Sequence, residues 1–135
     1  MTRINVIPPE DLTDQHLLAE YRELPRVFAL ARPNVATPKV YVLGEGHVKF
    51  FYPRTLWLAR RQESLVRECM SRGIRVQYTE PHVPVSGCDE DWAPTPEAVR
   101  LNLSRLHERL SQKPSLYTHR KKPVEADFYS KALSA

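Results

Sequence analysis

The feature that constrains the fold most is an amphipathic pattern near the start of the chain, between residues 14 and 31. Its apolar side chains fall within roughly one quarter of a helical wheel: Leu17, Tyr21, Leu24, Phe28 and Ala31. Asp11 or Thr13 can accept hydrogen bonds from the first turn and cap this helix. Pro25 lies inside the pattern, where its missing N–H removes a backbone hydrogen bond and predicts a kink. We therefore expect a helix that buries one stripe of side chains.

A second arc of this helix, about 120° wide, carries polar and charged residues. Its members are Gln15, His16, Ala19, Arg22, Glu23 and Arg26. By itself, this set is more typical of a solvated helix surface than of a catalytic centre, and Glu20 fits the same interpretation. The arc gains interest from the chain start, because a small residue after Met1 favours removal of Met1 and a mature chain that begins at Thr2.

A chain that begins at Thr2 carries a free α-amine beside Arg3. The α-amine has an ordinary pKa of about 7.7 to 8.0, so a good fraction is neutral and nucleophilic at physiological pH. Nearby arginines such as Arg22 and Arg26 would lower that pKa further. Such an amine can attack a sugar carbon and form a Schiff base, and Glu23 could stabilise the developing positive charge and transfer a proton.

A second helix is expected from about Pro53 to Arg72, with Gly73 ending it. Its predicted core face comprises Leu58, Ala59, Leu65, Val66, Cys69 and Met70. Its arginines fit a solvated face at least as well as a binding surface: Arg54, Arg60, Arg61, Arg67 and Arg72.

A third helix starts at residues 95–97, where a threonine cap is followed by a proline and an acid, and it ends at residues 113–114. The core stripe is Val99, Leu103, Leu106 and Leu110. Another face is shared by Asn102, Arg105 and Arg109.

The remaining segments read as loops or short strands. Residues 40–52 are apolar and punctuated by turns, and the Gly-Glu-Gly at 44–46 is better explained as a plain turn than as a phosphate loop. The acidic run at 89–91 could in principle hold a metal, but no partner at a telling spacing supports a metal site. The prediction is an all-α, compact single domain over residues 1–135, with three main helices, irregular loops and an ordered C-terminal tail.

Charge and composition favour an intracellular, cytoplasmic protein that binds nucleic acid or another polyanion. The formal net charge is +4, which predicts affinity that falls with salt. We expect no membrane segment, since no stretch approaches 18 apolar residues, and a reduced setting, since the two cysteines lack a framework spacing. The tail interleaves basic and aromatic residues, which suits phosphate contact and base stacking: Tyr117, His119, Arg120, Lys121, Lys122, Phe128, Tyr129 and Lys131.

Several stretches resemble the phage-type endonuclease V family, whose members are pyrimidine dimer DNA glycosylases with abasic-site lyase activity. The most specific are residues 1–5 (MTRIN), 14–17 (DQHL) and 19–28 (AEYRELPRVF). Further stretches resemble the family and follow in the same order along the chain: residues 43–52 (LGEGHVKFFY), parts of the predicted second helix, residues 105–106 (RL), 113–115 (KPS) with Tyr117, and 128–132 (FYSKA). The resemblance thus covers most of the chain.

This resemblance implies a mainly helical monomer that works without metal or cofactor on double-stranded DNA. The family hydrolyses the glycosidic bond of the 5′ base in a cyclobutane pyrimidine dimer and then cleaves the abasic strand by β-elimination, on a kinked duplex whose adenine opposite the dimer is flipped out. Thr2 matches the family's amine nucleophile, and Glu23 matches its essential acid. Positions that match DNA-contacting or site-shaping residues are Arg3, Gln15, His16, Arg22, Arg26, Arg105 and Arg109.

The tail departs from the family pattern. The family's Trp-Tyr run is replaced by Leu116-Tyr117, and an insertion containing residues 120–122 (RKK) precedes Phe128. Lys121, Tyr129 and Lys131 are the tail residues expected to help bind DNA. Two other hypotheses stay open: a non-catalytic basic helical DNA-binding module, and an abasic-site lyase with an altered lesion range.

Overall fold

The computed structural model describes residues 4–77 and 82–133. Three long helices dominate it: α1 (Asp14–Leu30), α2 (Thr55–Ser71) and α3 (Pro96–Gln112). The shorter elements are the 3-10 turns η1 (Pro9–Asp11), η2 (Lys49–Phe51) and η3 (Pro114–Leu116), the strands β1 (Thr118–His119) and β2 (Lys122–Pro123), and the helix α4 (Ser130–Leu133). The predicted all-α class with three main helices is confirmed, whereas the small β-hairpin and α4 were not foreseen.

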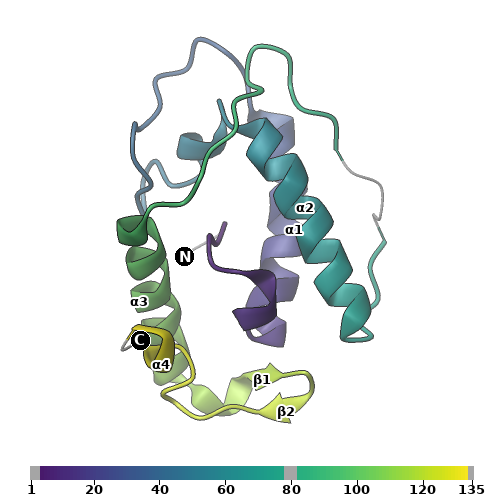
Figure 1. The fold of residues 1–135 in the computed structure, drawn as a ribbon, viewed down its shortest axis with the longest axis vertical. Coiled ribbons are helices and arrows are strands. Elements are labelled where there is room, and N and C mark those ends of the chain that lie inside the picture. The colour runs from purple at the N-terminus through teal and green to yellow at the C-terminus, as the bar shows by residue number, and fades with distance from the viewer. Residues whose placement is uncertain (1–3, 78–81, 134–135) are drawn as a thin grey trace.

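The long helices enclose the N-terminal segment. α1 and α2 lie side by side, and α3 stands opposite α1 with the segment leading to η1 between them (Figure 1). The hairpin of β1 and β2 lies near the start of α1, and α4 packs on α3. Within the described part of the chain, no helix is long and apolar enough to span a bilayer.

The predicted helix, its cap and its apolar stripe are confirmed for α1, whereas the kink at Pro25 stays a prediction. Thr13 caps the helix, its hydroxyl accepting from the backbone N–H of His16 at 3.2 Å. The predicted apolar stripe is buried, with Leu17 and Leu24 completely enclosed. The helix continues past Pro25 to Leu30.

The prediction for α2 is right for its ends and most of its core. Gly73 has a φ of +75°, and the N–H of Ile74 donates to the carbonyl of Cys69 at 2.9 Å, which is how a helix ends on a left-handed glycine. Met70 was assigned to the core wrongly, because it is 60% exposed.

Three charged residues expected at the surface are buried instead. Arg61, Arg72 and Glu20 are 7%, 5% and 1% exposed. Their burial is possible because each has charged partners from other parts of the chain. Periodicity assigned them to the surface because it ignores such partners.

The loops and α3 are as predicted, with one correction. Residues 40–52 form a partly buried loop around η2 rather than strands, and the N–H of His47 donates to the carbonyl of Gly44 at 3.1 Å in a plain turn. Leu103, Leu106 and Leu110 of α3 are buried as expected. Asn102, which was placed on another face with Arg105, is also completely buried, because its side chain hydrogen-bonds to the N-terminal segment.

Candidate active site

The N-terminal segment is anchored by side chains from all three long helices. The N–H of Val6 donates to Oδ1 of Asn102 at 2.8 Å, and Nδ2 of Asn102 donates to Oδ1 of Asn5 at 2.8 Å. Nδ2 of Asn5 in turn donates to Oε1 of Glu20 on α1 at 3.0 Å. The Asn5 amide is therefore satisfied on both sides, which defines its orientation.

Glu20 forms a buried two-point ion pair with Arg61 on α2. Nε of Arg61 lies 2.7 Å from Oε2 of Glu20, and Nη2 lies 3.0 Å from Oε1. Nη1 of Arg61 donates to the carbonyl of Ile7 at 2.6 Å. Desolvating two charges is costly, and parallel hydrogen bonds of this kind are what offsets the cost. The pair thereby ties the N-terminal segment to both α1 and α2.

A third anchor holds Ile4, the first described residue. Its N–H donates to Nε2 of His47 at 3.0 Å, and its carbonyl accepts from the hydroxyl of Tyr41 at 3.1 Å. Because Nε2 of His47 acts as an acceptor, Nδ1 carries the hydrogen and donates it to the carbonyl of Val42 at 2.8 Å. A neutral imidazole in one tautomer thus fixes the backbone at Ile4.

The segment runs alongside α1 in the opposite direction. Arg72 connects the two near the start of α1, since it bonds to Asp14 and to the carbonyls of Pro9 and Glu10. Asn5 meets α1 further on, at Glu20. Going backward from residue 10 to residue 4, the chain advances along α1 toward its later turns.

The next turn of α1 carries Glu23 and its arginines. The Glu23 side chain is 19% exposed, and one of its oxygens lies 3.7 Å from Nη1 of Arg26, whose side chain is 77% exposed. Arg22 is exposed on the same arc. The structure therefore brings together a half-buried carboxylate and two accessible guanidinium groups, as the sequence predicted. Thr2 and Arg3, the other predicted members, lie outside the described residues.

A second cluster surrounds His16 at the start of α1. The hydroxyl of Tyr129 accepts from the N–H of Thr13 at 2.9 Å and lies 2.7 Å from Nδ1 of His16. The His16 ring lies 4.8 Å from the ring of Tyr117. Burial lowers the pKa of His16 to about 4 and raises the pKa of Tyr129 to about 12.

This cluster revises the expectation for the tail aromatics. Tyr129 is only 1% exposed, so its ring packs into the core and does not stand ready to stack on a base. Tyr117 is half-buried against His16. Gln15 is exposed, and its side-chain amide bonds to the backbone N–H and hydroxyl of Thr118 at 2.9 Å and 3.2 Å.

Asp14 joins the start of α1 to the β-hairpin of the tail. Its carboxylate accepts from the backbone N–H groups of Arg120 and Lys121 at 3.0 Å and 2.9 Å, and from the Thr118 hydroxyl at 2.6 Å. Desolvation opposes ionisation of Asp14, yet its hydrogen bonds, the largest from Thr118, hold its pKa below the usual value. The same carboxylate also accepts from Arg72 at 3.0 Å.

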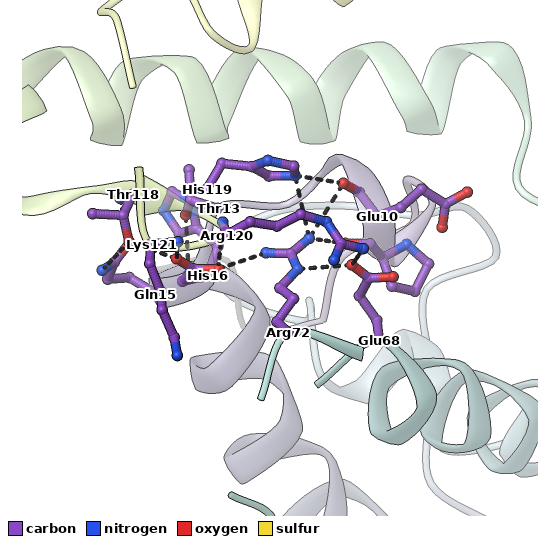
Figure 2. A network of polar contacts seen from close by, with 12 residues as sticks. Glu10, Thr13, Gln15, His16, Glu68, Arg72, Thr118, His119, Arg120 and Lys121 are labelled. Atoms are coloured by element: carbon purple, nitrogen blue, oxygen red, sulfur yellow. Dashed lines mark hydrogen bonds and ion pairs between the residues drawn. The ribbon is translucent and has the colours of Figure 1, made fainter. Parts of the chain in front are cut away.

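The hairpin turn is strained, and Asp14 holds it. Arg120 and Lys121 have φ angles of 51° and 70°, a left-handed pair that usually requires Asn or Gly. The Arg120 side chain extends toward Glu68 of α2 (Figure 2), 3.1 Å from its carboxylate, and is 47% exposed. Lys121 and Lys122 remain exposed. Sequence reasoning missed Asp14 and Arg72 as organising residues, although the four-residue spacing of Glu68 and Arg72 signals a helical ion pair.

The remaining predicted DNA-binding residues lie elsewhere. Arg105 on α3 is half-buried, 3.8 Å from Glu108, and Arg109 is exposed. Lys131 lies 3.9 Å from Asp127 in the tail. None of these contacts joins them to Glu23. In residues 4–77 and 82–133 no three potential metal ligands gather in one place.

A comparison with protein families identifies the part of the chain that holds the anchored segment, α1 and α2. The family model described as pyrimidine dimer DNA glycosylase matches residues 1–80, which is more than half of the 135 residues. The helix α3, the hairpin and α4 follow the matched region. The matched region contains the buried anchors of residues 4–7 and the carboxylate of Glu23 with its arginines. The chain therefore belongs to the pyrimidine dimer DNA glycosylase family, whose substrate is DNA that carries pyrimidine dimers.

Proposed function

We propose that the protein breaks the glycosidic bond of one base of a cyclobutane pyrimidine dimer and then cleaves the strand, using the main-chain amine of Thr2 as nucleophile. The observation that carries this proposal is the course of residues 4–10, which run backward along α1 and meet Glu20 at Asn5. Glu23 lies one turn further, about 4.5 Å along the helix axis. Thr2 is three residues before Asn5, and three residues of extended chain can span about 10 Å. This reach supports a position of the amine beside Glu23.

The chemistry follows from an amine beside a carboxylate. The amine attacks C1′ of the deoxyribose and forms a C–N bond, while the glycosidic bond breaks and its electron pair leaves with the base. Ring opening gives a protonated Schiff base, whose positive charge the carboxylate of Glu23 stabilises. Loss of a proton from C2′ then expels the 3′ phosphate by β-elimination, and Glu23 is the group that assists this proton transfer. Hydrolysis of the imine releases the enzyme.

The arginines contribute the contacts that bind DNA. Arg22 and Arg26 are exposed beside Glu23, and planar guanidinium groups suit bidentate contact with phosphate. Arg3, Gln15, Arg105, Arg109, Lys121 and Lys131 complete the proposed contact set. Kinking a duplex costs a few kcal/mol, which several phosphate contacts can offset. The flipped adenine opposite the dimer belongs to this proposal as well.

Reductive trapping tests the proposal directly. The mature protein, starting at Thr2, is incubated with a duplex that holds an abasic site or a dimer, in the presence of borohydride. We expect a covalent protein–DNA adduct that disappears when a removable N-terminal extension blocks Thr2 and returns when the extension is cleaved off. Absence of any adduct with the mature protein would refute the mechanism.

Glu23→Gln separates catalysis from binding. The substitution keeps the size of the side chain and removes its charge, so strand cleavage should be lost while binding to the lesion is retained. Unchanged cleavage would exclude the proposed role of Glu23. Binding without cleavage in the wild-type protein would favour the basic DNA-binding module, and cleavage of abasic sites alone would favour the lyase with altered lesion range.

A further inference from the structure

We propose that Asn102 on α3 is a positioning residue for the reactive amine, an inference that rests on the proposed function. Asn102 is completely buried, and both of its side-chain groups are used on the N-terminal segment. It follows the residues that the family model matches, so the link it makes comes from the remaining part of the chain.

The location of Asn102 is costly without these bonds. It lies in the middle of α3, next to the buried Leu103 and close to Leu106, and burying a side-chain amide in such apolar surroundings is unfavourable unless the amide is hydrogen-bonded. Asparagine is also a poorer helix former than leucine. Its two hydrogen bonds, both 2.8 Å long, offset that cost and are directional, unlike the apolar contacts around them.

The two bonds define the direction of the segment. The first holds the backbone N–H of Val6, and the second holds Oδ1 of Asn5, whose Nδ2 is bound to Glu20. With Asn102 present, the segment is held from α3 on one side and from α1 on the other. Without it, the Asn5 amide keeps only the contact to Glu20 and can rotate about that contact, and the Val6 N–H is left without its acceptor.

A small change of direction matters because the amine lies beyond the anchor. Ile4 keeps its own bonds to His47 and Tyr41, so the change of direction acts on the two residues before it. Two residues of extended chain span about 7 Å, so a 10° rotation at Ile4 moves the far end by about 1 Å. Misplacing a reacting group by about 1 Å can lower a rate by roughly 100-fold. Asn102 therefore controls the rate of amine attack without touching DNA or the amine itself.

The test compares Asn102→Ala with a matched control, Thr55→Ala. Thr55 is also completely buried and also satisfies two groups, since its hydroxyl donates to the carbonyl of Cys88 at 2.6 Å and accepts from the N–H of Val85 at 2.8 Å. Neither contact involves residues 4–7. The two variants should lose similar stability, so rates measured well below both unfolding transitions isolate the effect of positioning.

Three quantities are measured on each variant: the rate of borohydride trapping at saturating abasic duplex, the dissociation constant for the same duplex, and amide exchange at Val6. For Asn102→Ala we expect trapping to slow by about 10- to 100-fold, with a dissociation constant within about twofold of wild type and faster exchange at Val6. Thr55→Ala should trap within about twofold of wild type. If Asn102→Ala fails to fold, Asn102→Ser takes its place, because a shorter hydroxyl side chain cannot reach both groups.

The outcomes separate this inference from the function it rests on. A wild-type protein that forms no adduct would remove the proposed function and this inference with it. A wild-type protein that traps normally, together with Asn102 variants that trap equally fast, would leave the function standing and overturn the positioning role. Equal slowing in Thr55→Ala would also overturn it, because general destabilisation would then explain the loss.

Discussion

His16 should make the stability of this protein depend on pH between 8 and 4. Its ring is packed against Tyr117, and Nδ1 lies 2.7 Å from the Tyr129 hydroxyl. That hydroxyl accepts from the N–H of Thr13 and has its own hydrogen free to donate to Nδ1 of a neutral ring. Burial lowers the pKa of His16 from its ordinary 6.5 to about 4.

The direction and the size of this pH effect on stability follow from the difference in pKa between the folded and unfolded chain. The unfolded chain takes up a proton on His16 near pH 6.5, whereas the folded protein resists until about pH 4, so acid favours unfolding between these values. The contribution of His16 is complete above about pH 6.5 and is lost as the pH falls toward 4. At pH 5 the loss is about 2 kcal/mol, and at pH 4 it is about 3 kcal/mol.

The assay is urea unfolding of the wild type and of His16→Gln at several pH values between 8 and 4. The variant starts from lower stability but lacks this titration, so the difference in unfolding free energy between the two proteins should shrink by about 2 kcal/mol on going from pH 8 to pH 5. Leu18→Ala, two positions further along α1, is the control and should keep the wild-type pH dependence. A constant difference between wild type and His16→Gln would refute the reasoning, as would a His16 ring resonance that titrates near pH 6.5.

Three further predictions concern the ion pair, the hairpin and α3. Arg61→Met leaves the buried carboxylate of Glu20 without its charged partner and should lower the free energy of unfolding by about 3 to 5 kcal/mol. Arg60→Met, at an exposed pair, should change that free energy by less than about 1 kcal/mol, and equal effects of the two variants in thermal unfolding would contradict this prediction. Lys121→Gly relieves a φ of 70° and should raise stability by about 1 kcal/mol, while a glycine at the neighbouring strand position 122 should lower it, as read from urea midpoints. Arg105→Ala should reduce the slope of log affinity against log salt by about 0.9 if Arg105 meets a phosphate, and Arg100→Ala, about 140° around the helix, should leave the slope unchanged.

Periodicity predicted the helices and most of the core because both depend on local spacing. The stripe of α1 and the glycine that ends α2 are where the sequence placed them. The same reasoning failed at Glu20, Arg61 and Asn102, since a charged or amide side chain is buried only when distant partners satisfy it. Glu20 and Arg61 are 41 residues apart in the chain, and no local pattern indicates such a pairing.

The hairpin was missed for a related reason. A two-residue turn with both residues left-handed is normally recognised by Asn or Gly, and here Arg120 and Lys121 occupy it. The conformation is held by the carboxylate of Asp14, more than 100 residues earlier. The candidate site was predictable in part: the arc of Glu23, Arg22 and Arg26 follows from helical spacing, whereas the anchoring of residues 4–7 does not.

The anchoring also explains why polar groups are buried at the centre of a small protein. Ile4 and Ile7 are packed in the core, and apolar contacts of this kind stabilise without favouring one orientation over another. A chain end whose amine must attack one carbon of a sugar has to be held in one orientation. Hydrogen bonds from Asn102, Glu20 and His47 restrain this orientation because they are directional. Replacing a buried ion pair with apolar residues often leaves stability unchanged or improves it. Under the proposed reaction, apolar residues in place of the Glu20–Arg61 pair would therefore cost little stability and still slow the reaction, because stability and the orientation of the chain end depend on different contacts.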